Sequence, residues 1–169
     1  DELFDTKCSA YTTWADPKRA SADATSVNLL DDADERVRFL GATALKPEHP
    51  AFVKGEGVHY QFDRALAGRL IAAAAKEPSE TVAVSLGARV ARIDVEKTGA
   101  LEPIIAMVKA RKHVRAVREV IQNVLFSNSR HRPTYDFMIG MTKDPDDKLR
   151  YDAVGAFWVG GGLSRSETC

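Results

Sequence analysis

Long apolar runs are missing from this sequence, and so is an excess of charge of either sign. The longest nearly uncharged stretch, residues 153–163, is shorter than the roughly 18 apolar residues of a membrane-spanning helix, and Gly160, Gly161 and Gly162 interrupt it. We therefore expect a soluble chain without a membrane span. The 24 basic residues balance the 24 acidic ones, so no overall field would attract nucleic acid or an anionic membrane.

Cysteine is scarce. Cys8 and Cys169 lie near opposite ends of a chain that begins at Asp1, without an initiator methionine or a signal sequence. Two thiols outside a repeated region could form a disulfide in an oxidising compartment, which favours a secreted or periplasmic protein. The alternative is a cytoplasmic protein with two free thiols. We expect an exported protein. The sequence is compatible both with a disulfide between the two cysteines and with two free thiols.

Residue spacings typical of metal or catalytic sites are also missing. The four histidines, His49, His59, His113 and His131, show no paired ligand spacing, and the two distant cysteines complete no zinc pattern. A glycine-rich phosphate loop and a nucleophile elbow are absent as well. The sequence therefore predicts no structural metal, no cofactor and no catalytic residue.

An internal repeat is the strongest pattern that is present. The segment 31–45, DDADERVRFLGATAL, recurs at 143–157 as KDPDDKLRYDAVGAF. The matched pairs are Asp32 with Asp144, Asp34 with Asp146, Arg36 with Lys148, Val37 with Leu149, Arg38 with Arg150 and Ala44 with Ala156. Two looser copies lie between these segments, marked by the runs 76–78 and 109–111. The recurring lysines 76, 109 and 143 are spaced like helical hairpins.

Apolar residues within a unit follow the spacing of an amphipathic helix, as at Leu101, Ile104, Ile105 and Val108. A hairpin of two such helices cannot bury both apolar faces, whereas a stack of hairpins can. Alternating strand patterns are nearly absent. At 169 residues we expect a single helical domain. The predicted helices span residues 23–30, 34–46, 63–76, 79–92, 99–110, 112–126, 134–142 and 146–158.

The patterns GALEPIIAMVKA, followed by a basic second helix, and DPDDKLRYDAVGAF resemble HEAT-like repeats of the short, lyase type. The resemblance covers residues 26–159. It implies an all-α fold, an α-α superhelix (solenoid) of about four two-helix repeats. The domain would span residues 23–159 with an inserted loop at 46–62, between tails at 1–22 and 160–169.

The resemblance also implies structural roles for particular residues. In that family an Asp at the turn and an Arg six residues later form a ladder between successive units, a spacing found at Asp32 with Arg38 and at Asp144 with Arg150. The middle units depart from it, because Ala83 follows six residues after Glu77 and no acidic residue stands six positions before Arg115. We therefore expect an incomplete ladder.

Three regions are candidate binding sites. In HEAT-like proteins the second helices form the concave face, an extended docking surface; its candidates here are Arg89, Arg92, Arg115, Arg118, Glu119, Gln122, Lys148, Tyr151 and Asp152. The 46–62 loop, with His59 and Tyr60, is either a contact loop or a connector packed on the stack. The basic cluster at 109–118 could contact phosphates, but without interleaved aromatic residues we do not expect nucleic-acid binding.

Our leading hypothesis is a non-enzymatic protein-binding scaffold that uses the second helices. The alternative is a HEAT-like enzyme or enzyme subunit that holds a small molecule or nucleic acid in the same groove, and a terminal fragment of a longer repeat protein is a third reading. A deep apolar cavity with converging polar groups would favour the enzyme. Trp14 and Trp158 are predicted to cap the ends of the stack, or else to form an exposed patch for assembly.

Overall fold

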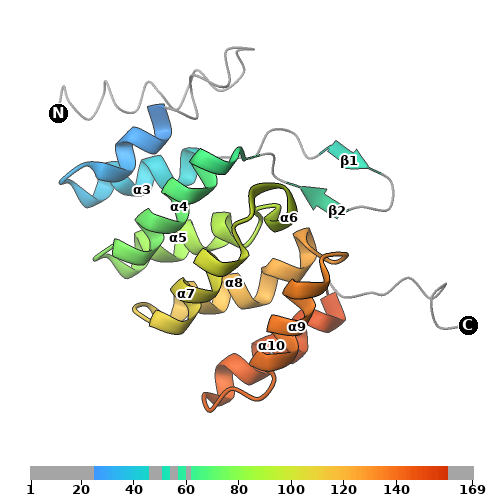
Figure 1. The fold of residues 1–169 in the computed structure, drawn as a ribbon. Coiled ribbons are helices and arrows are strands. Elements are labelled where there is room, and N and C mark those ends of the chain that lie inside the picture. Colours follow the sequence, from blue (N-terminus) through green and yellow to red (C-terminus); the bar gives the residue numbers. More distant parts are fainter. Residues whose placement is uncertain (1–24, 46–50, 54–56, 60–61, 160–169) are drawn as a thin grey trace, which may run out of the picture.

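The computed structural model describes residues 25–45, 51–53, 57–59 and 62–159, which are helical except for one short hairpin. The predicted all-α class is thus confirmed. A helical turn at 25–28 precedes the following elements: η2 Leu29–Asp31, α3 Glu35–Ala44, α4 Arg64–Lys76, α5 Glu80–Val90, α6 Val95–Thr98, α7 Leu101–Ala110, α8 Val114–Ser127, α9 Arg132–Met141 and α10 Asp147–Val159 (Figure 1).

Two details differ from the predicted elements. The loop expected at 46–62 contains an antiparallel pair of strands, β1 Ala51–Val53 and β2 Gly57–His59, in which Phe52 lies opposite Val58. A short helix that was not expected, α6 Val95–Thr98, precedes α7, and Gly99, in a left-handed conformation (φ 69°), ends it.

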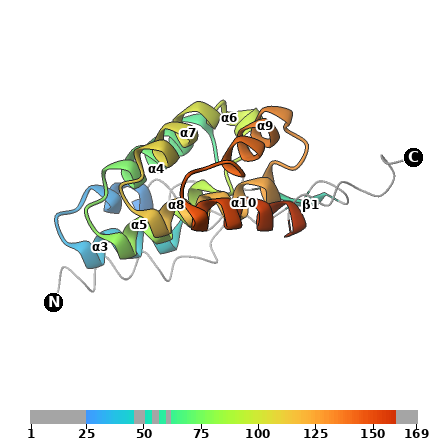
Figure 2. The same ribbon diagram turned by 90° about the horizontal axis from the view of Figure 1, so that it is seen from below.

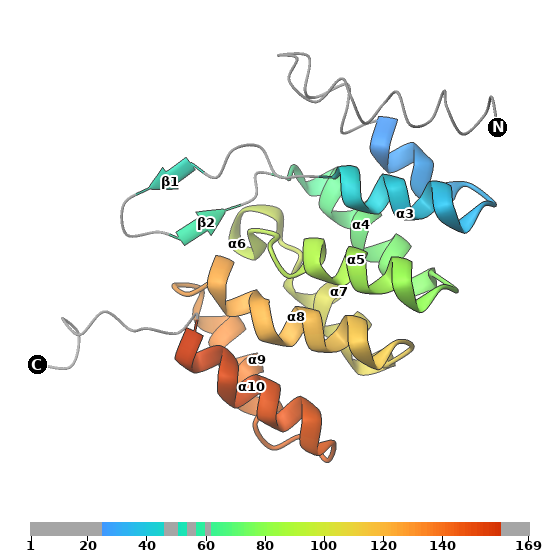
Figure 3. The same cartoon turned by 180° about the vertical axis from the view of Figure 1, so that it is seen from behind.

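The helices form two layers, which are separated most clearly in Figure 2. The first helices of the hairpins, α4, α7 and α9, form one layer, here called the A layer. The second helices, α3, α5, α8 and α10, form the B layer, in which each helix contacts the next (Figure 3). Each unit therefore places one helix in each layer, and η2 packs on α3 in the first unit.

The core lies between the two layers. Leu70, Ile104 and Met138 point into it from the A layer, and Leu86, Ile121 and Leu149 meet them from the B layer, all at most 1% exposed. Burying such side chains contributes about 1.5–3 kcal/mol each. The amphipathic spacing read from the sequence is therefore the spacing that fills this core.

Short polar side chains begin the helices. Asp34, Asp63, Ser79 and Asp94 each accept a backbone N–H in the first turn of α3, α4, α5 and α6. At the start of α10, Asp146 Oδ1 accepts from Lys148 N at 2.9 Å. These contacts satisfy N–H groups that have no partner inside the helix.

One glycine sets the distance between the two central B-layer helices. A Cβ atom on Gly87 of α5 would lie 2.7 Å from the backbone oxygen of Ala116 in α8. No side chain fits there, so α5 and α8 pack almost backbone to backbone. At this crossing glycine allows the close approach of the two helices.

Candidate functional site

The turns that lead into the B-layer helices share one local structure. Asp32 Oδ1 accepts from Asp34 N, Glu77 Oε1 accepts from Ser79 N, and Asp144 Oδ1 accepts from Asp146 N, each at 2.9 Å. Arg111 occupies the same place before α8, in a left-handed conformation (φ 51°). We call Asp32, Glu77, Arg111 and Asp144 the turn residues.

The two predicted ladder arginines bind the turns of their own units, and they bind backbone atoms. Arg38 Nη1 donates to the carbonyl oxygens of Asp32 and Ala33, both at 2.9 Å. Arg150 Nη1 donates to those of Asp144 (2.6 Å) and Pro145 (3.1 Å). Within their own turns these arginines thus bind backbone oxygens, and the Asp144 carboxylate forms an ion pair with Arg111 of the preceding unit.

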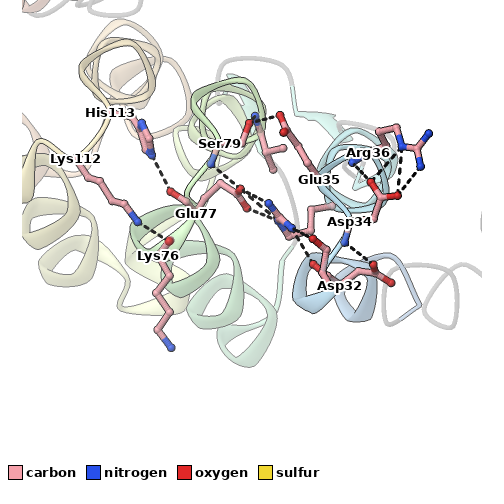
Figure 4. Close-up of polar contacts among 12 residues, drawn as sticks. Asp32, Asp34, Glu35, Arg36, Lys76, Glu77, Ser79, Lys112 and His113 are labelled. Atoms are coloured by element: carbon pink, nitrogen blue, oxygen red, sulfur yellow. Dashed lines mark hydrogen bonds and ion pairs between the residues drawn. The ribbon is translucent and has the colours of Figure 1, made fainter.

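An ion pair between the first two units involves a residue that was not selected from the sequence. Arg38 Nε and Nη2 donate to the two carboxylate oxygens of Glu77 at 3.0 Å (Figure 4). The Glu77 side chain is buried, and its hydrogen bond raises the pKa of Arg38. Glu77 could have been found in the sequence, because it stands at the turn position of Asp32 and Asp144.

Contacts between turns continue through the following units. Lys112 Nζ donates to the carbonyl oxygen of Lys76 at 2.5 Å, and His113 Nε2 lies 2.7 Å from that of Glu77 (Figure 4). Arg111 then forms an ion pair with Asp144. Successive turns are therefore joined along one edge of the domain, although the middle units lack the expected Asp and Arg pattern.

Three of the predicted binding residues join α8 to α10. Arg118 Nε donates to Asp152 Oδ2 at 2.5 Å, and Gln122 Nε2 donates to Asp152 Oδ1 at 2.8 Å. Burial would raise the pKa of Asp152, but the hydrogen bonds from Arg118 and Gln122 and the charge of Arg118 outweigh it and lower that pKa. These side chains form a bridge between helices.

The remaining B-layer candidates differ in their surroundings. Arg89 donates to the carbonyl oxygens of Ala42 (3.3 Å) and Thr43 (3.2 Å) and so closes the end of α3. Arg115 is 75% exposed, with Glu80 4.0 Å away. Arg92 and Glu119 are half-buried and Tyr151 is exposed. Of the predicted set, Arg115, Lys148 and Tyr151 are exposed.

Exposed apolar side chains gather on the B layer. Among the described residues, seven large hydrophobic side chains are exposed, and six of them lie on α3, α8 and α10: Phe39, Val114, Phe126, Tyr151, Val154 and Trp158. The seventh, Ile139, lies on α9 in the A layer. Trp158 is 85% exposed, so the prediction that it caps the end of the stack against solvent is wrong. Its side chain is available for a contact.

Several predicted residues fall outside the described part. Cys8, Trp14, His49, Tyr60 and Cys169 belong to residues that are not described, and only the backbone of His59 is described, in β2. In the described segments no three His, Cys, Asp or Glu side chains form a group that could hold a metal ion. No helix in them is both long and apolar enough to cross a membrane.

Two open clefts lie at the edges of the domain. One, of about 340 Å³, is lined by residues of η2, α3 and α4, and its Arg69 already contacts Asn28 and Asp31. The other, of about 310 Å³, lies beside Asn128 and His131. Asn128 is buried and bonds to Val95 N, Ile93 O and Val124 O. The polar groups named here hold the fold together.

Comparison with known proteins adds no assignment. The sequence matches no protein-family model, and neither the curated proteins nor the solved structures contain a significant match. The geometry of the B layer is therefore the basis for a functional proposal.

Proposed function

We propose that this chain is a non-enzymatic protein-binding scaffold: a HEAT-like stack of four two-helix units that presents its B layer to a protein partner. The single observation that carries the proposal is the distribution of exposed apolar side chains, six of seven of which lie on B-layer helices. Large apolar side chains exposed on one layer of a folded domain offer anchors to a protein partner, because burying them on binding is favourable.

The repeated turn contacts support the HEAT-like part of the proposal. Arg38 and Arg150 make the same pair of backbone hydrogen bonds at equivalent positions of the first and last units. Each B-layer helix contacts the next one in the chain. Stacks with such nearest-neighbour contacts present long continuous faces to their partners.

The polar residues of the B layer divide into two groups under this proposal. Arg118 and Gln122 bind the Asp152 carboxylate, and Arg89 binds a carbonyl oxygen near the C-terminus of α3. These side chains therefore stabilise the helices that form the surface. Arg115 is 75% exposed, with Glu80 4.0 Å away, so it is accessible to a partner. Phe39 and Phe126 supply apolar anchors, and aromatic residues are enriched in protein interfaces.

The test is affinity capture from a native extract with three forms of the chain: wild type, the double variant Phe39→Asp with Phe126→Asp, and Ile139→Asp. The last is a matched control, because it introduces the same charge at an exposed apolar position of the A layer. A captured protein is then purified and titrated against each form, after thermal melting has shown that all three are folded.

We expect the partner to bind the wild type and Ile139→Asp alike, and to bind the double variant at least about tenfold more weakly, because each lost anchor contributes more than about 1 kcal/mol. Equal binding to all three forms would contradict the proposal. It would direct attention to the two clefts.

A further inference from the structure

The repeated segments 31–45 and 143–157 occupy different positions in the stack. The first segment contains α3, which receives the next B-layer helix, α5. It does so through Arg38, which binds Glu77 at the start of α5, and through Glu35, which accepts a hydrogen bond from Ser79. The structure therefore shows that a segment of this sequence, when it lies inside the stack, forms the surface on which the following B-layer helix packs.

The second segment carries the same receiving groups on α10. Arg150 is equivalent to Arg38 and Asp147 to Glu35 in the repeat. Arg150 makes the same backbone bonds as Arg38, but the carboxylate it contacts is Asp147 of its own helix. Its side chain is 39% exposed, against 12% for Arg38. The acidic partner from a following helix has no counterpart in the described residues.

The apolar positions lead to the same conclusion. Ala42, Gly87 and Ile121 are buried in the first three B-layer helices, but the equivalent Val154 of α10 is 48% exposed. Ala91 and Leu125 are fully buried, whereas the equivalent Trp158 is 85% exposed. With Tyr151, these side chains form a stripe at i, i+3 and i+7 along α10. We call Tyr151, Val154 and Trp158 the end stripe.

We propose that α10 receives one amphipathic helix of a protein partner, which lies along the end stripe as α5 lies along α3 and places an acidic residue just before its N-terminus, as Glu77 precedes α5, against Arg150. This proposal rests on the proposed scaffold function. It adds the location of one binding surface and the kind of partner that binds there. Its grounds are continuity with the internal helix contacts and the charge of Arg150.

The dimensions of the end stripe favour a single helix over a second copy of the chain. Residues 151 to 158 span about 10 Å of helix, far too little for the roughly 800 Å² per partner that a stable dimer buries. A second copy also cannot offer its own α5, whose Val82, Ala83 and Leu86 are fully buried.

The probe is a synthetic peptide of residues 76–92, the segment that α3 receives inside the chain. A hydrocarbon staple between positions 84 and 88, beside Gly87 on the α8-facing side, keeps it helical, and a fluorescein label reports binding by anisotropy. The full-length chain is titrated as wild type, Arg150→Glu, Trp158→Asp and Arg132→Ala. The last removes an exposed arginine of α9 and is the matched control.

We expect saturable binding by the wild type and by Arg132→Ala, and at least about tenfold weaker binding by Arg150→Glu and Trp158→Asp. A peptide with Glu77→Lys should bind the wild type poorly and recover affinity for Arg150→Glu. This recovery separates a lost contact from a lost fold.

Two results would overturn the proposal. The first is a wild-type chain that does not bind the peptide, or that binds it independently of Trp158 and Arg150. The second is a dimer in sedimentation that Trp158→Asp dissociates, which would assign the stripe to a second copy. Neither result concerns the capture of a partner through Phe39 and Phe126. The scaffold function is therefore tested independently of this proposal.

Discussion

Arg118 of α8 and Asp152 of α10 form a two-pronged ion pair in which the carboxylate is only 2% exposed. The guanidinium donates from Nε at 2.5 Å and from Nη2 at 3.1 Å, and Gln122 adds a third hydrogen bond to the same carboxylate. A buried charge with all its partners supplied is stable, but it becomes costly once a partner or the charge is removed.

Replacing Asp152 with Asn should therefore lower the free energy of unfolding by about 1–3 kcal/mol, less than for a fully buried pair because Arg118 is partly hydrated. Urea denaturation measures the change. Asp136→Asn is the control, since Asp136 forms an exposed ion pair with Arg132 and should change stability by less than about 0.5 kcal/mol. Equal effects of both substitutions would show that the Asp152 contacts contribute nothing.

The same carboxylate predicts a pH dependence. The pKa of Asp152 is lowered in the folded chain, so its contribution to stability is complete above the ordinary Asp value of about 3.9 and is lost as the pH falls through the folded-state pKa. The stability difference between wild type and Asp152→Asn should therefore shrink below about pH 4. A difference that stays constant down to pH 2.5 in urea titrations would be inconsistent with the lowered pKa.

Gly87→Ala should separate α5 from α8, because the new Cβ would meet the Ala116 carbonyl oxygen at 2.7 Å. We expect a loss of about 1–3 kcal/mol, the usual cost of overpacking a tight site. Gly68→Ala in α4 is the matched control: its Cβ would meet nothing within 4 Å, so it should stabilise the helix by up to about 1 kcal/mol. Thermal melting distinguishes the two, and a neutral Gly87→Ala would refute the close crossing.

Arg38→Ala should destabilise the chain more than Arg150→Ala. Arg38 joins two units through Glu77, whose buried carboxylate would lose its charge partner, so we expect about 2–3 kcal/mol. Among the described residues Arg150 contacts only its own unit, and it is more exposed than Arg38, so a loss of about 1 kcal/mol or less is expected. Chemical denaturation of both variants makes the comparison, with Arg132→Ala as the neutral control; the reverse order would contradict this assignment.

The helices were predictable because their signals are local. The spacing of Leu101, Ile104 and Val108 and the capping Ser79 act within a few residues, and both are found in α7 and at the start of α5. The repeat also located equivalent turns at Asp32 and Asp144, whose contacts match closely in the structure.

The contacts between units were not predictable in the same way. The bond from Arg38 to Glu77 joins residues 39 positions apart, and only the packing of α3 on α5 brings them together. The exposure of Trp158 depends on which elements pack against α10. The local sequence around Trp158 does not specify these elements. The hairpin of β1 and β2 depends on pairing between two very short strands, which leave a weak signal in a helical sequence.

Leu45 and Phe62, which flank the segment that contains β1 and β2, are both buried in the common core. Because each end of the segment is anchored separately, its length is not fixed by the stacking of α3 on α4 and α5. Lengthening a surface connection costs little closure entropy, about 0.6 kcal/mol for each doubling. Between these two anchors the domain should therefore accept a genetically inserted reporter or a split of the polypeptide, with the helical layers on either side still able to assemble.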